Sequence, residues 1–397
     1  MTKVEITRQV SIPDEIKIAR FKKTPELGPK ILFFSGGTAL REISKEIIKY
    51  SHNTIHIITA FDSGGSSRKI RDAFDMIAVG DLRNRMMALA DQSIKGNPEI
   101  YKLFAHRLPL DKAKEELLAI LLNIINGSHP MISIISNPMR KIITNHLQFF
   151  VDIMPNNFDL KGASIGNLII VGGYFSQDKD IDSVIFMFSK LVESRGVVRP
   201  VTSESMHIGV ELSDGVKLVG QDLITGKEQK PLNKKIKNIF LTRNHESNES
   251  ADIETEEKIV TLINSADLIC YPMGSFYSSL LVNLLPKGVG SAIAKANCPK
   301  VYLMNSYEDP ERFGLNPDES VKVLLEYLKK DCSDNVSTSN LLNFVVTDLA
   351  NSPIRSTIDV NKIEDLGVKF ISTPLMPAKD EKIYSPTMIC DFLASLS

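Results

Sequence analysis

Two aspartates and a glycine loop are the residues whose types and spacing best suit chemistry on a phosphorylated ligand. Gly36, Gly37 and Thr38 follow an apolar run and precede a helical pattern. Such a loop exposes backbone N–H groups at a helix N-terminus, where phosphate binds well. Asp62 follows the next apolar run, so its carboxylate is expected to face the same crevice. The pattern predicts a phosphorylated ligand, with Asp62 and Asp81 as candidate ligands of Mg²⁺ and candidate catalytic groups.

Each of these signals also has a purely structural interpretation. The Gly36-Gly37-Thr38 loop matches neither G-x-G-x-x-G nor the P-loop pattern, so it could be a tight turn required by packing. Asp62 could cap a turn or a helix, because aspartate favours both positions. Asp81 stands just before LRNRMMAL, where a helix N-cap would also stand.

Further candidate ligand contacts are polar residues and glycines close to expected strand ends. Arginine suits bidentate phosphate recognition, an asparagine could bind a base or carbonyl, and a tyrosine could stack on a base. The alternatives are a solvated helix face, close packing at glycines and a buried core tyrosine. These candidates are Gly64, Gly65, Ser66, Ser67 and Arg68 after Asp62; Arg83 and Asn84 after Asp81; Asn167; and Gly274, Ser275 and Tyr277.

The elements that must position these residues follow an α/β pattern. Apolar runs at 31–34 and 55–60 predict strands, and the spacing of apolar residues predicts a helix over 38–50. Two parallel strands joined by a helix form a right-handed βαβ unit. Later strands are expected at 267–271, 301–305, 344–347 and 368–371, with a helix over 318–330. The alternation predicts a Rossmann-like, doubly wound, mostly parallel sheet.

Three other regions complete the expected organisation. Residues 1–29 contain three prolines and are expected to form an irregular N-terminal arm, followed by a single α/β domain over 30–397. Residues 95–160 predict a helical elaboration. Residues 207–230 alternate around Ser213-Asp214-Gly215 and predict a β-hairpin.

Composition argues against several function classes. The chain has 397 residues, a net charge of −1 and scattered Lys and Arg, so no nucleic-acid surface is expected. Its apolar runs are too short for a membrane span, and the N-terminus lacks a signal-peptide pattern. Cys270, Cys298, Cys332 and Cys390 are far apart and are expected to be free thiols in the cytoplasm. A homodimer fits such an α/β protein, although no interface is visible in the sequence.

Taken together, the segments resemble a superfamily that contains 2-phospho-L-lactate transferases (CofD-like) and gluconeogenesis-factor (YvcK-like) proteins. The matching pieces occur in the family's order over about residues 30–305. They are SGGTAL, ITAFDSGGSS, VGDLRNRMMALAD, LFAHRL, GASIGNLII, VVRPVT, HIGVELSDG, ADLICYPMGSFYSSLLVNLLPKGVGSAIA and KVYLMN.

The resemblance implies a Rossmann-like fold with a nucleotide-containing ligand at the carboxyl edge of the sheet. One branch resembles Mg²⁺-dependent transferases that move a phospholactyl-type group from a GDP-linked donor to a deazaflavin alcohol. The other branch resembles regulators of carbon metabolism and cell-wall synthesis that bind UDP-sugars. The family's elements map onto Gly36, Gly37 and Thr38; Asp62; Gly80, Asp81, Arg83 and Asn84; and Gly274, Ser275 and Tyr277.

The chain departs from the family pattern at two positions. Ala39 stands where the family often has glycine, and Ser63 stands where the gluconeogenesis-factor branch tends to have a second aspartate. The second departure weakens the case for a metal held by paired aspartates. Three hypotheses therefore follow: a Mg²⁺-dependent transferase, a non-catalytic UDP-sugar sensor, and a degenerate member that serves as a structural partner.

Overall fold

A seven-stranded sheet forms the centre of the computed structural model, which describes residues 9–93, 96–226, 231–377 and 383–397. The strand order is β10-β9-β8-β7-β1-β2-β3, and every neighbouring pair is parallel. The strands are β1 (Ile31–Ser35), β2 (Ile55–Ile58), β3 (Val197–Pro200), β7 (Leu268–Tyr271), β8 (Lys300–Leu303), β9 (Phe344–Thr347) and β10 (Lys369–Ser372). The predicted Rossmann-like, doubly wound architecture is confirmed.

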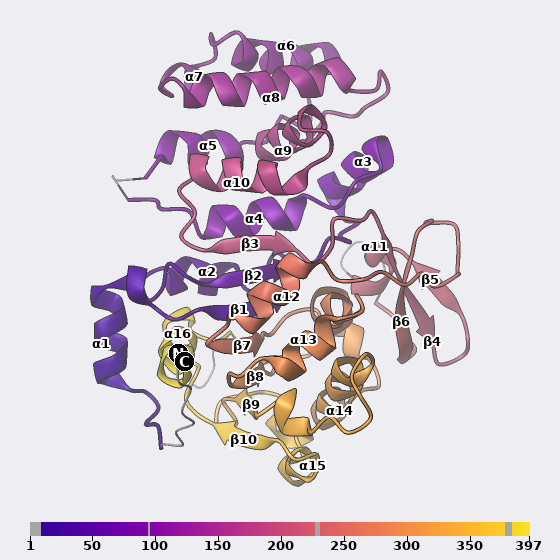
Figure 1. Ribbon diagram of the computed structural model, residues 1–397. Helices are drawn as coiled ribbons and strands as arrows, with labels where there is room; N and C mark the ends of the chain where they lie inside the picture. The colour runs from indigo at the N-terminus through magenta and orange to yellow at the C-terminus, as the bar shows by residue number, and fades with distance from the viewer. Residues whose placement is uncertain (1–8, 94–95, 227–230, 378–382) are drawn as a thin grey trace.

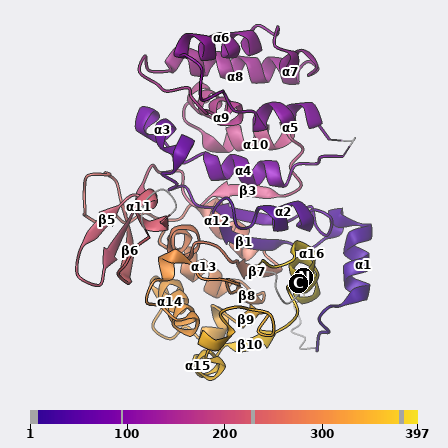
Figure 2. The same ribbon diagram turned by 180° about the vertical axis from the view of Figure 1, so that it is seen from behind.

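Helices cover both faces of the sheet because the chain winds in two directions from its centre. The helix α2 (Arg41–Ile47) connects β1 to β2, whereas α13 (Val289–Lys295) connects β7 to β8 on the other side of β1. Right-handed crossovers in opposite directions place their helices on opposite faces. α16 (Pro386–Leu396) packs on α2, while α12 (Glu257–Asn264) and α14 (Pro317–Lys329) pack on α13 (Figures 1 and 2).

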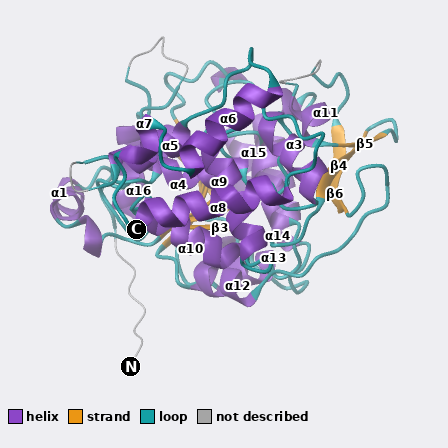
Figure 3. Cartoon of the chain, turned by 90° about the horizontal axis from the view of Figure 1, so that it is seen from above, coloured by secondary structure: helices purple, strands orange, loops and turns teal. Residues whose placement is uncertain are grey.

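A stack of helices extends beyond the β3 edge of the sheet and covers it when seen from above (Figures 1 and 3). Its centre is α9, which is buried from Ile165 to Gly173 and packs closely on α8, where Gly172 faces the backbone of His146. The predicted helical region is therefore present, and it continues to residue 191. The helices of the whole stack are α3 (Gly65–Phe74), α4 (Gly80–Ala88), α5 (Pro98–Ala105), α6 (Lys114–Ile125), α7 (Pro130–Ser133), α8 (Met139–Ile153), α9 (Ile165–Ser176) and α10 (Ile181–Leu191).

A small antiparallel sheet projects at one side of the large sheet (Figure 1). The predicted hairpin is present as β4 (His207–Leu212) and β5 (Lys217–Val219), with Gly215 at a positive φ of 86° in the turn. A third strand, β6 (Ile236–Thr242), pairs with β4 and was not predicted. The short helix α11 (Gln221–Thr225) follows β5 and carries the chain back toward the large sheet.

The prediction of an irregular N-terminal arm is wrong for α1 (Glu15–Lys23). This helix begins where the Asp14 side chain accepts a hydrogen bond from the Lys17 N–H at 3.0 Å. It packs on α16 near the C-terminus, and Ile18 is buried in that contact. Residues 1–8 lie outside the described residues. The partner that stabilises α1 is more than 360 residues away in the sequence, so local sequence patterns did not reveal it.

The remaining elements are short. They comprise α15 (Val360–Asp365), a π-helical turn over Phe276–Leu280, and 3₁₀ turns over Pro25–Leu27, Leu281–Leu284, Pro310–Arg312, Thr338–Asn340 and Arg355–Thr357. Among the described residues, no helix has both the length and the apolar character needed to cross a bilayer.

Candidate functional site

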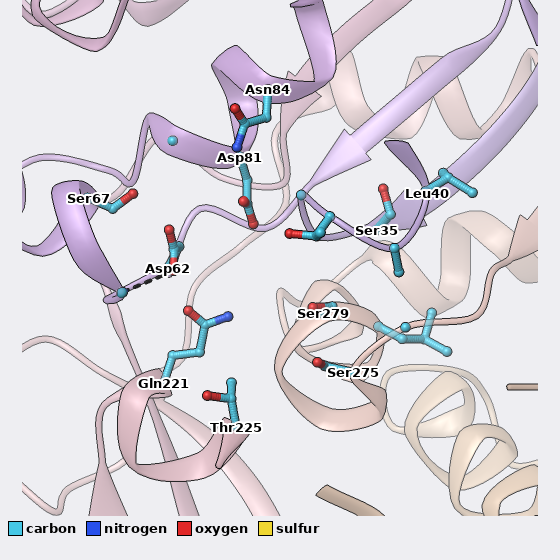
Figure 4. Close-up of a pocket in the computed structure, with 18 of the residues that line it drawn as sticks. Ser35, Leu40, Asp62, Ser67, Asp81, Asn84, Gln221, Thr225, Ser275 and Ser279 are labelled. Carbon is cyan, nitrogen blue, oxygen red and sulfur yellow. Dashed lines mark hydrogen bonds between the residues drawn. The ribbon is translucent and has the colours of Figure 1, made fainter. Parts of the chain in front are cut away.

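A cavity of about 370 Å³ opens at the carboxyl ends of β1 and β7. The chain continues from β1 to β2 on one side and from β7 to β8 on the other side. Ligands bind at such a point of divergence in open α/β sheets. Figure 4 shows Asp62, Asp81 and Asn84 on one side of the cavity, Gln221 and Thr225 on the opposite side, and Ser275 and Ser279 nearby. The lining includes most of the predicted residues: Gly36, Gly37, Thr38, Asp62, Gly64, Gly65, Ser67, Asp81, Arg83, Asn84, Gly274 and Ser275.

The glycine loop after β1 is held in place by Arg85, which is fully buried under the loop's carbonyl groups. Its guanidinium donates hydrogen bonds to the carbonyl oxygens of Gly36 at 2.8 Å and Leu40 at 2.9 Å. Burial lowers the pKa of Arg85 to about 10, while the nearby charge of Asp81 acts in the opposite direction. The loop carbonyls are thus turned toward a buried cation. Arg85 was not predicted as part of the site, because a buried arginine four residues after Asp81 looks like any other helix residue.

Asp81 lies directly against the glycine loop. A Cβ atom added at Gly37 would overlap the Asp81 carboxylate, and one added at Gly36 would lie 2.6 Å from the Ser279 hydroxyl. Asp81 is in the first turn of α4 and is not its N-cap residue, which is Val79. The two glycines are therefore required by the close approach of polar side chains.

Asp62 faces the same space as Asp81 (Figure 4). One carboxylate oxygen, Oδ1, accepts a hydrogen bond from the Gly64 N–H at 3.0 Å, so part of its role is to shape the turn. Gly80 lies close to this aspartate. A Cβ atom added at Gly80 would overlap the Ser67 hydroxyl and would lie 3.5 Å from the other carboxylate oxygen of Asp62, Oδ2. Gly80 thus permits the start of α4 to pack against the loop that carries Asp62.

The wall opposite the aspartates comes from α11, which was not predicted to take part. Ser63, next to Asp62, accepts a hydrogen bond from the Gln221 N–H at 2.8 Å and donates one to the Asp222 carboxylate at 3.2 Å. Arg68 forms an ion pair with Asp222 at 3.1 Å. These contacts join the small sheet to the loop after β2 and place Gln221 and Thr225 in the cavity lining. The only sequence signal was a short polar segment between two glycines.

The loop after β7, which carries the candidate ligand contacts Gly274, Ser275 and Tyr277, is not open to an anion through its helical backbone. Its backbone N–H groups are already engaged by side chains: Asp309 accepts from Phe276 at 2.8 Å, and Glu311 accepts from Tyr277 and Ser278 at 2.9 Å each. These carboxylates occupy the positions that a phosphate would take. Gly274 and Ser275 still line the cavity.

Several other predicted contacts lie away from the cavity. The Tyr277 side chain is buried in the core, with its hydroxyl 3.4 Å from the Ile236 carbonyl, so the core interpretation was right and stacking on a base is not available in this arrangement. Asn167 is fully buried within α9. Arg68 points to Asp222 and is absent from the lining. Ser66 lies in the first turn of α3, and its side chain is outside the described residues.

The donor set fits a magnesium ion only in part. No group of three His, Cys, Asp or Glu side chains that could hold a metal occurs in the described part of the chain. Mg²⁺ is commonly held by one or two carboxylates together with ligand phosphates and waters. Asp62 and Asp81 supply that number of carboxylates beside a glycine loop, so they suit a metal that arrives with a phosphorylated ligand.

Comparison with known proteins identifies the family. Residues 31–376 match the profile of the family described as "2-phospho-L-lactate transferase CofD". The chain belongs to the CofD family. Curated relatives of this CofD-family chain are gluconeogenesis factors. That of Listeria monocytogenes is 27% identical over 311 residues, covering 78% of this chain and 77% of the relative. That of Bacillus subtilis is 25% identical over 363 residues, covering 90% and 95%.

A solved structure shows the same fold. A UPF0052-family protein from Bacillus halodurans superposes with a TM-score of 0.66 at 22% identity, covering 92% of this chain and 99% of that chain. The CofD-family fold therefore extends well beyond residue 305, where the sequence resemblance had stopped. The strands β9 and β10 are part of it.

Proposed function

We propose that this CofD-family chain binds a nucleoside-diphosphate-linked donor together with Mg²⁺ and transfers a phospholactyl-type group to an acceptor alcohol. The observation that carries the proposal is the meeting of Asp62, Asp81 and the glycine loop in one cavity. Carboxylates repel a diphosphate unless a divalent cation lies between them. The acidic side of the cavity, beside the glycine loop, therefore favours a metal-dependent ligand over one that binds through charge pairing alone.

Each residue has a defined task in this proposal. Asp62 and Asp81 would hold Mg²⁺, which when bound neutralises charge on the diphosphate oxygens. The backbone of the glycine loop would contact phosphate oxygens, and Arg85 would keep that backbone in place. In the transfer, the acceptor oxygen forms a bond to the distal phosphorus, the bond to the nucleoside monophosphate breaks, and the hydroxyl proton is released.

A non-catalytic UDP-sugar regulator is the second candidate function. Two observations favour it: the curated relatives are named gluconeogenesis factors, and Ser63 is engaged with α11 instead of supplying another carboxylate. A sensor needs only binding energy, and α11 with the small sheet could then report on the occupied site.

Ligand binding and turnover measured together test the proposal. Thermal unfolding is followed with GDP, UDP-glucose and UDP-N-acetylglucosamine, each with and without Mg²⁺, and ³¹P NMR follows conversion of a GDP-linked donor. A ligand at a hundredfold its Kd adds about 2.7 kcal/mol of stability. Asp62→Asn should abolish the Mg²⁺-dependent effect and turnover, whereas Asp365→Asn, an exposed carboxylate on α15, should change neither. UDP-sugar binding without metal or conversion would instead establish the sensor.

A further inference from the structure

Two arginines at one end of the cavity lack an acidic partner. Arg83 and Arg107 both line the cavity, and neither forms an ion pair with Asp or Glu in the part of the chain that the structure describes. Arg83 is only 5% exposed, and its Nε has no hydrogen-bond partner among the described residues. Within the described part of the chain, its Nη groups donate only to the neutral oxygens of Ser164 and Asn84. Burying a guanidinium without an acidic partner is costly, so this arrangement points to a function.

The segment 162–166 contacts both Arg83 and Arg107 and holds their side chains in place. The Gly162 carbonyl accepts a hydrogen bond from Arg107 Nη1 at 3.0 Å, and the Ser164 hydroxyl accepts one from Arg83 Nη1. The backbones of Arg107 and Ser164 also form an isolated β-bridge. Gly166 makes room for the Arg83 stem, because a Cβ atom there would lie 2.9 Å from Arg83 Cδ. All of these partners are neutral, so the segment holds two like charges together without neutralising them.

The electrostatic consequence is visible at Arg83. Its pKa is lowered to about 10, chiefly by burial and then by the charge of Arg107, with Asp81 opposing and Arg41 adding a smaller decrease. Two cations from separate segments, α4 and the loop that carries Arg107, therefore line this end of the cavity. Guanidinium groups held in this way match a carboxylate or phosphate, whose oxygens accept charge-assisted hydrogen bonds.

We propose that Arg83 and Arg107, seated by the segment 162–166, form a subsite for a second oxyanion of the ligand, separate from the diphosphate at the glycine loop. The inference rests on the proposed function for the placement of the first anion. The cavity is then polarised. Asp62 and Asp81, with a cation, hold the diphosphate, and the arginines hold a carboxylate or phosphate elsewhere on the donor or on the acceptor.

Inorganic phosphate is the probe that tests the subsite. Its binding is measured by calorimetry with GDP or UDP and Mg²⁺ already saturating, so that the first anion position is filled. Arg107→Gln should weaken phosphate binding at least about tenfold, the loss expected for a charge-assisted hydrogen bond, and leave nucleotide binding within about threefold. Arg107 is exposed, so its replacement should not disturb folding. Arg83→Gln should act in the same direction, and Arg20→Gln, on the exposed face of α1, serves as the matched control.

The outcomes separate this inference from the proposed function. If nucleotide binds but neither phosphate nor lactate binds in a way that depends on Arg107, the subsite is overturned and the proposed function stands. If no nucleotide binds while phosphate affinity still depends on Arg107, the subsite stands and the proposed function fails. A parallel titration with lactate identifies a carboxylate subsite if lactate, and not phosphate, shows the dependence on Arg107.

Discussion

The carboxylate of Asp81 occupies the space that a side chain at Gly37 would fill. This relationship links the first turn of α4 to the loop after β1, and it fixes an acidic group at the backbone proposed to bind phosphate. The glycine is therefore needed for the position of the aspartate as well as for the conformation of the loop.

Gly37→Ala should lower ligand affinity at least about tenfold, because the new methyl group displaces either Asp81 or the loop. Calorimetry with the ligand identified in the thermal panel measures the loss. The matched test is a double-mutant cycle. In an Asp81→Ala background the clash is gone, so Gly37→Ala should then cost much less. Equal costs in both backgrounds would show that the two residues act independently.

Arg85→Met should lower the free energy of unfolding by about 3 kcal/mol, because several carbonyl groups of the glycine loop lose a charged donor while they stay buried. Urea unfolding measures the change. Arg20→Met, an exposed arginine on α1, is the control and should change stability by less than about 0.5 kcal/mol. A stable Arg85→Met variant with unaltered ligand binding would contradict the supporting role assigned to Arg85.

Ser63→Ala should cost about 1 kcal/mol, since the Gln221 N–H loses the side-chain oxygen that caps α11. Ser63→Asp should cost more, because the new carboxylate would face that of Asp222. Adding Asp222→Asn to Ser63→Asp should recover stability, as followed by urea unfolding. If Ser63→Asp alone is as stable as the parent chain, α11 is not held in the way that the structure indicates.

Glu311 should make stability depend on pH. Burial, with a further contribution from Asp309, raises its pKa to about 7 from the ordinary value of 4.5. The folded state therefore binds a proton that the unfolded state has released. Stability should fall as the pH rises from about 4.5 to about 7, by at most about 1.4 kcal/mol per pH unit from this group.

Glu311→Gln isolates that contribution, because the amide keeps an acceptor for the Tyr277 and Ser278 N–H groups but cannot ionise. Unfolding free energies at pH 5, 6 and 7 should show a smaller decrease with pH in the variant than in the parent chain. Parallel curves for the two proteins would mean that Glu311 titrates normally. Glu364→Gln, an exposed carboxylate on α15, is the control.

The sheet and the first half of the site could be predicted from sequence because their signals are local. An apolar run followed by Gly36-Gly37, and another followed by Asp62, each identify a strand and the loop at its carboxyl end. The rules for parallel sheets then bring these loops to one edge. β3, β6 and α1 were missed. Each is stabilised by an element that is not its neighbour in the sequence: β2, β4 and α16, respectively.

The opposite wall of the cavity, formed by α11, could not be predicted from local sequence signals. Gln221 is placed by the Ser63 hydroxyl, 158 residues earlier in the chain. The loop after β7 resembles an anion site in sequence, yet Asp309 and Glu311 fill it from a turn about 30 residues later. Such contacts leave no periodic or spacing signal.

The sequence by itself therefore determined the fold class and the glycine loop with its two aspartates, because hydrophobic periodicity and short-range turn chemistry encode them. The family followed from the ordered set of motifs that resembles it. The tertiary structure decided that the backbone N–H groups after β7 are engaged, that Arg85 supports the glycine loop, and that Ser164 joins Arg83 to Arg107. Those features depend on which distant side chains meet once the core has packed, and packing is a property of the whole chain.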